Sequence, residues 1–385
     1  MKGEFVPRKK NESSVRLDAR FDCRYYSGYK PCGRNPNCDM RCHAYEPRGT
    51  RILIIKLAAM GDVLRTTPVA EALRKHYHYC HITWITDPES EPLLRYNPAI
   101  DRLLTWSPDS CLILQAEKFD LVLNFEKEMR ALALDTLTQS RTKRGFALHP
   151  GAGTLVIHNA ASEYALRLGI DDDLKFRQNT KTMPRILCEM AELPYEGEEY
   201  VLQIGRGSVA FAERFREKAG LKTDERVIGL NTGCGAVFPT KQWPLENCVE
   251  LIGLLRRETT ARVLLLGGVR EREFNAAILE KAPRGSVTDT GTENSLEEFI
   301  GLMELCDVVV SADSLAMHLA IGRRKPVIAL IGPTSAAEIE VYGRGGKIVS
   351  PAPCAPCYRT SCDKTPSCMC LISARQVLEA VLKWL

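Results

Sequence analysis

The sequence contains no long hydrophobic run. No apolar stretch approaches the roughly 20 residues that span a bilayer, although 45% of the 385 residues are hydrophobic. The basic N-terminus, MKGEFVPRKKNESS, lacks the apolar stretch that would follow it in a secretory signal. We therefore expect a cytoplasmic protein without a transmembrane helix.

A strong excess of one charge is also lacking. The 52 Lys and Arg residues exceed the 48 Asp and Glu residues by four. So small an excess gives no argument for binding nucleic acid. It is compatible with an anionic ligand and with a peripheral association with the acidic face of an inner membrane.

A regular alternation of short apolar runs and longer helical stretches begins after residue 50. The runs that predict strands are 51–57, 81–86, 119–125, 226–231, 262–268, 307–312 and 326–332. Near-continuous apolar runs are typical of parallel strands covered on both faces. The intervening segments, such as 245–258, are long enough for crossover helices. The pattern predicts an α/β protein with two Rossmann-like, doubly wound parallel-sheet domains facing across a cleft.

Four segments follow from this pattern. A polar, charged stretch near 216–226 suggests the boundary between the two sheets. The expected division is a cysteine-rich N-terminal segment, a first Rossmann-like domain, a second Rossmann-like domain, and a cysteine-rich loop with a C-terminal helix. Their bounds are 1–50, 51–215, 216–350 and 351–385.

The first strand-to-helix junction lacks the glycine run that often holds a nucleotide. The segment ILIIKLAAMGDVLRTTPV (52–69) offers a single Gly61, followed at once by Asp62. Asp62 has two candidate roles, as a helix cap or as a general base. The pair Thr67-Pro68 is a better helix opening, which favours the second role.

The loops of the second half carry features suited to a diphosphate. In TGCGAVFPTKQW (232–243), small residues permit a turn whose N–H groups can hold an anion, and Lys241 adds a positive charge. After the run 307–312, Asp313 and Ser314 open a helix whose N-terminus favours phosphate. No GxxxxGK[ST] motif is present, which argues against hydrolysis at a γ-phosphate. Each of these features also has a purely structural interpretation. The loop 232–243 could be an ordinary glycine turn, Asp313 could only cap its helix, and His318 could be a packed side chain.

Three segments together resemble glycosyltransferase family 9, the ADP-heptose:lipopolysaccharide heptosyltransferases. They are KLAAMGDVLRTTPV, PTKQWP and DSLAMHLAIGRRKPVIALIGPT, and the resemblance spans about 51–350. It implies the GT-B fold, with the acceptor on the first domain and the nucleotide-sugar donor on the second. It also implies an inverting glycosyltransferase that moves heptose from ADP-heptose to a hydroxyl of a lipopolysaccharide core or another glycan or lipid-linked acceptor. No cofactor is expected in the catalytic cleft.

The resemblance also assigns roles to single residues. Asp62 matches the proposed general base and Lys241 the lysine that binds the donor phosphate. The remaining expected donor-binding residues are Thr232, Gly233, Glu271, Glu273, Asn294, Asp313, Ser314, Leu315 and His318. Either Glu271 or Glu273 corresponds to a ribose-binding glutamate, and a solvated helix face is the alternative for both. Two positions depart from the family: Leu315 replaces a glycine, and Asn294 replaces an apolar side chain that contacts adenine in a relative.

The fifteen cysteines are unevenly distributed, and two clusters suggest structural metal sites. Such clusters in a cytosolic protein are more often metal-binding than disulfide-bonded. The expected thiolate ligands are Cys23, Cys32, Cys38 and Cys42, and Cys354, Cys357, Cys362 and Cys368. Zinc, iron and an iron–sulfur cluster all fit thiolate ligands. Reduced thiols without a metal are the alternative.

Two other functions are compatible with this fold. A nucleotide-sugar epimerase would need no separate acceptor. A non-catalytic nucleotide-sugar-binding protein would have no use for Asp62 opposite the donor.

Overall fold

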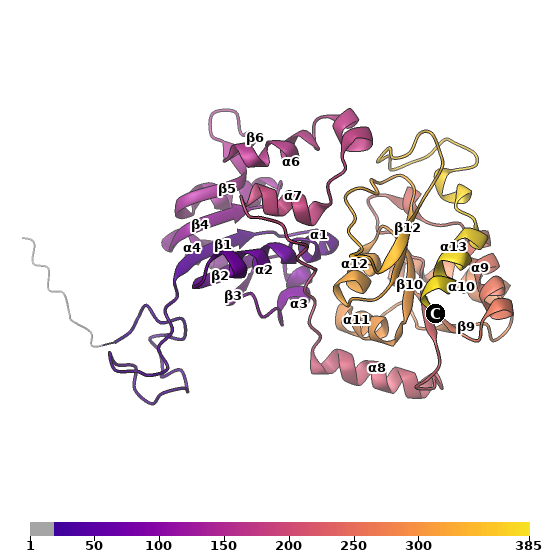
Figure 1. Cartoon of the computed structure of the whole chain (residues 1–385), viewed down its shortest axis with the longest axis horizontal. Coiled ribbons are helices and arrows are strands. Elements are labelled where there is room, and N and C mark those ends of the chain that lie inside the picture. Colours follow the sequence, from indigo (N-terminus) through magenta and orange to yellow (C-terminus); the bar gives the residue numbers. More distant parts are fainter. Residues whose placement is uncertain (1–18) are drawn as a thin grey trace, which may run out of the picture. The chain divides into compact units, whose positions relative to one another are not determined.

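The computed structural model describes residues 19–385. The chain separates into two compact units, Met1–Gly49 and Thr50–Leu385. In the first unit, the described residues form turns and bends with an isolated antiparallel bridge between Cys23 and Pro47. The second unit holds both sheets (Figure 1).

The first sheet has six strands in the order β3-β2-β1-β4-β5-β6. They are β1 (Thr50–Ile55), β2 (Cys80–Thr86), β3 (Arg102–Thr105), β4 (Lys118–Asn124), β5 (Gln139–His149) and β6 (Thr154–Ile157). All neighbours pair in parallel except β6, which runs antiparallel to β5.

The second sheet has the order β12-β11-β10-β7-β8-β9 and is parallel throughout. Its strands are β7 (Val227–Asn231), β8 (Arg262–Leu266), β9 (Val287–Asp289), β10 (Val308–Ala312), β11 (Val327–Ile331) and β12 (Gly345–Val349). Counted from its own first strand, each sheet follows the Rossmann order 3-2-1-4-5-6. The order reverses between β1 and β4 and between β7 and β10. Ligands in such sheets bind at the carboxyl ends of the strands beside that reversal.

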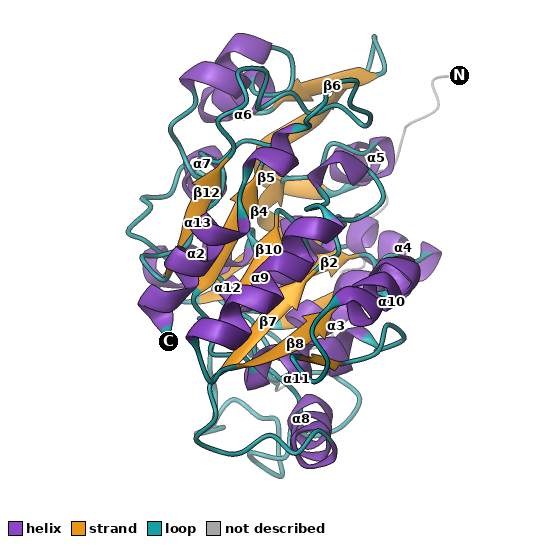
Figure 2. Cartoon of the chain, turned by 90° about the vertical axis from the view of Figure 1, so that its right-hand side faces the viewer, coloured by secondary structure: helices purple, strands orange, loops and turns teal. Residues whose placement is uncertain are grey.

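Helices cover both faces of the sheets (Figure 2). Those of the first half are α1 (Met60–Leu64), α2 (Thr67–His76), α3 (Glu91–Leu94), α4 (Pro108–Ala116), α5 (Met129–Leu137), α6 (Glu163–Arg167) and α7 (Met183–Met190). The others are α8 (Arg206–Lys218), α9 (Leu245–Glu258), α10 (Arg272–Lys281), α11 (Leu296–Leu305), α12 (Leu315–Gly322) and α13 (Ala374–Val381). Their starts follow local sequence rules: Ser295 and Glu298 form a capping box at α11, and Ser373 and Gln376 form one at α13.

The hydrophobic core explains why the strand runs are so apolar. Side chains alternate across a strand, so Ile52 and Ile54 enter one core cluster while Leu53 and Ile55 enter another on the opposite face. In β10, Val309 likewise faces away from the cluster that contains its neighbours Val308 and Val310. Both sheets are therefore buried on both faces, which confirms the predicted α/β architecture.

The structure contains every predicted strand and several strands that were not predicted. All seven predicted runs contain strands, and α9 has the predicted bounds. Five strands were not predicted: β3, β5, β6, β9 and β12. The expected boundary at residues 215 and 216 falls inside α8, which packs on α11, and the four-segment division stays a prediction. Within residues 19–385, no helix is both long and apolar enough to cross a membrane.

Candidate functional site

Asp62 lies in the first turn of α1, which follows the short loop after β1. Its Oδ1 is 2.7 Å from Nη2 of Arg65, and 38% of its side chain remains exposed. Burial acts to raise the pKa of the Asp62 carboxyl, but Arg65, Lys56 and His318 outweigh that effect and hold the pKa below its usual value. The carboxylate is therefore ionised and accessible.

The lone glycine before Asp62 makes room for the second half of the chain. A Cβ at Gly61 would lie 2.5 Å from Cδ2 of His318 on α12. His318 is buried, with Nδ1 3.5 Å from the Tyr200 hydroxyl oxygen and Nε2 3.8 Å from Oδ1 of Asp313. Burial lowers the pKa of His318 to about 4, so the imidazole is neutral near pH 7. His318 is thus packed, as one alternative predicted, and brings α12 against α1, the helix that carries Asp62.

Lys241 and Asp313 meet at the carboxyl ends of β7 and β10. Lys241 ends a short 3-10 turn, Pro239–Lys241, and its Nζ lies 3.8 Å from Oδ2 of Asp313. Only 13% of the Lys241 side chain is exposed. Asp313 lies between Lys241 and His318, so the structure brings these three predicted residues into one cluster near Asp62.

The glycine loop after β7 distinguishes two of the predicted positions. Thr232 is buried, and its hydroxyl donates to Oδ1 of Asn275 at 2.6 Å. The Thr232 side chain therefore points into the protein interior. A Cβ at Gly233 would lie 3.3 Å from Oε2 of Glu271. Glu271 also accepts a hydrogen bond from the Gly268 backbone at 2.9 Å.

Of the two candidate glutamates, the structure places Glu271 at this loop. Glu273 is exposed in the first turn of α10, which matches the solvated helix face that was its alternative.

The start of α12 differs in detail from the prediction. The helix begins at Leu315 with Ser314 at the N-cap position, and neither Asp313 nor Ser314 is its first residue. The Ser314 side chain makes no capping hydrogen bond. Its hydroxyl lies 2.9 Å from that of Ser311 and 3.2 Å from Nδ2 of Asn231. Leu315 is partly buried against the core.

Asn294 lies apart from the Lys241–Asp313 cluster. Its amide donates to the backbone oxygens of Thr290 and Gly291 at 3.1 and 3.2 Å. It lines an open depression together with Arg272 and Glu293. Its amide hydrogens are thus engaged within its own turn.

A buried ion pair at the first sheet was not predicted. Nζ of Lys56 lies 2.9 Å from Oε2 of Glu126, and both side chains are less than 10% exposed. The same oxygen accepts hydrogen bonds from the Leu57 and Ala58 backbones, each at 3.2 Å. A glutamate directly after the predicted strand 119–125 was the available signal for this contact.

Arg65 was also not predicted as a site residue, although it lies inside the segment 52–69 that contains Asp62. While its Nη2 contacts Asp62, its Nη1 lies 3.8 Å from Oε2 of Glu338, in the segment between β11 and β12. Glu338 could not be predicted as a partner of Arg65, because no local sequence feature links it to α1.

The N-terminal cysteines Cys23, Cys32, Cys38 and Cys42 line one small cavity. Across residues 19–385, however, no group of three or more His, Cys, Asp or Glu side chains is arranged to hold a metal ion. The structure gathers these four thiols without forming a coordination site.

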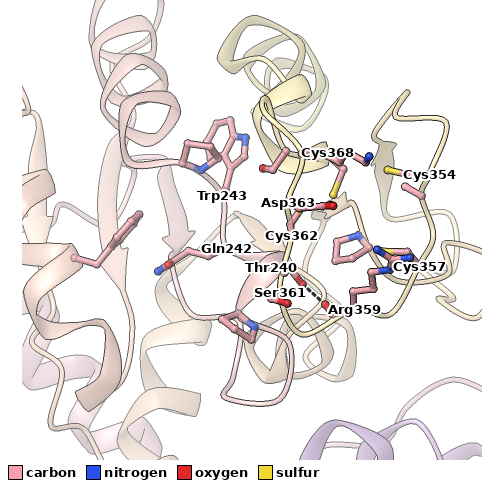
Figure 3. Close-up of a pocket in the computed structure, with 17 residues that line it drawn as sticks. Thr240, Gln242, Trp243, Cys354, Cys357, Arg359, Ser361, Cys362, Asp363 and Cys368 are labelled. Atoms are coloured by element: carbon pink, nitrogen blue, oxygen red, sulfur yellow. Dashed lines mark hydrogen bonds between the residues drawn. The ribbon is translucent and has the colours of Figure 1, made fainter.

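The C-terminal cysteines line a larger cavity of about 510 Å³ (Figure 3). Its lining includes Cys354, Cys357, Cys362 and Cys368. Burial raises the pKa of the Cys368 thiol to about 11, and the neighbouring thiols add to this. Thr240, which also lines the cavity, donates to the Arg359 backbone oxygen at 2.7 Å, so the cysteine loop braces the residue before Lys241.

A tyrosine of the cysteine loop also contacts the first half of the chain. Tyr358 stacks on Phe176 with ring centroids 5.6 Å apart, and Nζ of Lys175 lies 3.9 Å from its centroid. These contacts were not predicted. They place the loop beside both halves of the Rossmann-like unit.

Comparison with known proteins gives a consistent picture. Residues 113–367 match glycosyltransferase family 9 (heptosyltransferase). The chain is 23% identical to lipooligosaccharide heptosyltransferase 2 of Haemophilus influenzae over 301 residues, which cover 74% of this chain and 84% of that protein.

Two solved structures share the fold. A glycosyl transferase of family 9 from Veillonella parvula has a TM-score of 0.69 at 21% identity, covering 87% of this chain and 97% of that one. The E. coli ADP-heptose lps heptosyltransferase II has a TM-score of 0.64 at 18% identity, covering 87% and 98%. The two-sheet architecture is therefore GT-B. With two thirds of its length matched, the chain belongs to glycosyltransferase family 9 and is a glycosyltransferase.

Proposed function

We propose that this protein is an inverting heptosyltransferase that uses ADP-heptose and glycosylates a hydroxyl of a lipopolysaccharide core or related glycan. The single observation that carries the proposal is the contact of α12 with Gly61. It brings an exposed, ionised Asp62 next to the Lys241–Asp313 cluster. The family and the relatives named above support heptose as the sugar, and the name of the E. coli neighbour supports ADP-heptose as its form.

The donor diphosphate is assigned to the loops of the second sheet. Lys241 supplies a positive charge, and the Gly233 loop and the first turn of α12 supply backbone N–H groups. Glu271 would contact the ribose. Because Lys241 lies 3.8 Å from Asp313, the arriving diphosphate would take over the ammonium from that carboxylate. The donor site is further shaped by Thr232, Ser314, Leu315 and His318. Asn294 would reach the donor only if the nucleotide extends to the separate depression that Asn294 lines.

Asp62 is assigned as the general base. It takes the proton of the acceptor hydroxyl while that oxygen attacks the anomeric carbon on the face opposite the diphosphate. The bond from the anomeric carbon to the diphosphate oxygen breaks in the same step, and the diphosphate leaves with the electron pair. Lys241 offsets the charge that develops on the leaving group. These residues perform the transfer without a cofactor in the cleft.

The surroundings of the reaction are part of the proposal. The acceptor binds the first Rossmann-like domain and the donor the second, as the expected division at 51–215 and 216–350 implies. The protein works in the cytoplasm, where the lipid-linked acceptor brings it to the inner membrane.

The two cysteine clusters are proposed as structural metal sites. Four thiolates around each cavity fit zinc, iron or an iron–sulfur cluster by their chemistry. Metal content and absorbance spectra of the purified protein would test this assignment. Loss of metal in the double variant Cys354→Ser/Cys357→Ser, with the N-terminal cysteines intact, would assign one site to the C-terminal cluster.

Asp62→Asn tests the base assignment. We expect kcat to fall at least about 100-fold, because the amide cannot accept the proton. ADP-heptose should still raise the Tm of the variant, since the donor site is unchanged. Asp109→Asn is the matched control, because Asp109 is also an acid in the first turn of a helix, α4. Equal, small effects of both substitutions would mean that Asp62 only stabilises its helix.

A donor panel separates the rival functions. ADP-heptose should stabilise the protein against heat more than UDP-, GDP- or CDP-sugars do. Isomerisation of the donor without acceptor would favour an epimerase. Donor binding with neither transfer nor isomerisation would favour a binding protein.

A further inference from the structure

Arg65 connects the proposed base to the other half of the molecule. It follows α1, and its guanidinium contacts Asp62 through Nη2 at 2.7 Å and Glu338 through Nη1 at 3.8 Å. The side chain of Arg65 is 20% exposed and that of Glu338 is 11% exposed. One partly buried cation is therefore shared between two carboxylates, one from each half.

We propose that Arg65 is a positioning residue for Asp62, and that Glu338 adjusts the basicity of Asp62 by drawing part of the Arg65 charge away from it. This inference rests on the proposed function, because it assigns a task to residues around the proposed base. The proposal goes beyond that function by linking the base on the first half to a carboxylate on the second half through Arg65.

The geometry of the contact leaves Asp62 able to react. Arg65 occupies Oδ1, and a guanidinium presents its donors in a fixed planar fork. The carboxylate is thereby oriented, while 38% of the Asp62 side chain remains exposed to an acceptor hydroxyl.

Glu338 is held in place by neighbours on two sides. Its backbone oxygen accepts a hydrogen bond from the Met183 N–H at 3.0 Å, at the start of α7. Its Oε1 lies 3.4 Å from the Tyr358 hydroxyl, which donates to it. The carboxylate is therefore a fixed charge that can hold Arg65 in a defined position.

The charge around Asp62 comes from several elements. The charged and titratable groups that face Asp62 or Arg65 are Lys56, Lys127, Tyr200, Asp313, His318, Glu338 and Tyr358. Arg65 is the cation in direct contact with Asp62, so a change in its position or charge has the largest effect on the pKa of Asp62. A carboxylate fully neutralised by an arginine is a weak proton acceptor, whereas the pKa of a carboxylate that loses its neighbouring cation rises.

The pH dependence of kcat tests the proposal through two opposite shifts. Arg65→Gln removes the stabilising cation, so the acid limb of the profile should move to higher pH by about one unit. On the pH-independent plateau, kcat should also fall about 10-fold, because Asp62 is no longer held in position. Glu338→Gln removes the competing carboxylate, so the limb should move to lower pH by about half a unit. Assays would use ADP-heptose at saturation and the lipopolysaccharide-core acceptor. Arg65→Lys keeps the charge and should shift the limb less than Arg65→Gln.

A second cross-sheet ion pair provides the control. Arg95 follows α3, and its Nη1 lies 2.7 Å from Oε1 of Glu297 on α11. Neither residue is among the charged groups that act on Asp62 or Arg65. Arg95→Gln and Glu297→Gln should leave the acid limb unmoved. If Arg65 and Glu338 only braced the two halves, their variants would lower Tm without moving the limb.

The outcomes separate this inference from the proposed function. Normal turnover of Asp62→Asn would remove the base and this inference with it. An inactive Asp62→Asn, combined with unshifted limbs or shifts in the same direction for Arg65→Gln and Glu338→Gln, would overturn this inference alone. Because Glu338→Gln is isosteric, it tests the proposal even if Arg65→Gln does not fold.

Discussion

The two sheets share one strand order and use the same loop position in opposite ways. In the first sheet, the backbone N–H groups after β1 donate to Glu126, whose carboxylate also pairs with Lys56. In a dinucleotide-binding domain this loop holds a pyrophosphate. In the second sheet, the loop after β7 carries Gly233 and leads to Lys241, whose ammonium contacts Asp313 at 3.8 Å. Identical topology thus gives one anion position filled by the protein itself and one suited to a ligand.

This difference explains the unusual first loop. With Glu126 occupying the anion position, the chain beyond it has no need for a glycine run, and Gly61 serves the close approach of His318 instead. Asp62 is then free to face the neighbouring half. Breaking the filled position should cost stability, whereas altering the open one should cost donor binding.

The largest expected effect is on stability, from Glu126→Gln. The substitution leaves the Lys56 ammonium buried without a counter-charge, and breaking one partner of a buried ion pair costs about 3–5 kcal/mol. Urea titration of the variant should show this as a lower midpoint. Adding Lys56→Met should recover part of the loss, because the unpaired charge disappears.

An exposed glutamate in the same loop is the control for that experiment. Glu128 pairs with Arg130 at 2.8 Å, and 48% of its side chain is exposed. Glu128→Gln should change the free energy of unfolding by less than about 1 kcal/mol. Similar losses of unfolding free energy in both variants would mean that the buried Lys56–Glu126 pair contributes no more to stability than an exposed pair.

The next effect concerns the open position, through Lys241→Ala. A hydrogen bond to a charged group contributes about 1.5–3 kcal/mol, so kcat/KM for ADP-heptose should fall about 10- to 100-fold. The affinity for ADP, measured by calorimetry, should fall as well. Lys241→Arg keeps a positive charge and should lose less. An unchanged kcat/KM and an unchanged affinity would refute the donor role of Lys241.

Much of the fold could be predicted from the sequence, because the central strands are buried on both faces and therefore read as continuous apolar runs. The missed strands lack that signal. The strand β5 reads QSRTKRGFALH, with exposed polar residues in its first half, and β9 has only three residues. Strands at or near a sheet edge bury less surface, so their sequences are less constrained.

The candidate site likewise contains residues that the sequence could predict and contacts that it could not. Asp62, Lys241, Asp313 and His318 each lie in a contiguous segment whose glycines, strand ends and helix starts indicate a loop at the sheet edge. The contacts Lys56–Glu126 and Arg65–Glu338 join residues far apart in the chain, and a single sequence does not reveal such pairs. The choice between Glu271 and Glu273 depended on the turn before α10, which only coordinates define.

The smallest expected effect distinguishes those two glutamates and sharpens the contrast with Glu126. Glu271 borders the open loop, since a Cβ on Gly233 would lie 3.3 Å from its Oε2, whereas Glu273 is exposed on α10. A lost hydrogen bond of about 1 kcal/mol corresponds to about a 5-fold weaker affinity for ADP in Glu271→Gln. Glu273→Gln should bind ADP as the wild type does, and neither variant should lose the stability that Glu126→Gln loses. Calorimetric titration with ADP, and with adenine as a ligand without ribose, would locate the effect. With adenosine as a third ligand, which carries the ribose but no diphosphate, a weaker affinity for ADP and adenosine together with an unchanged affinity for adenine would assign Glu271 to the ribose.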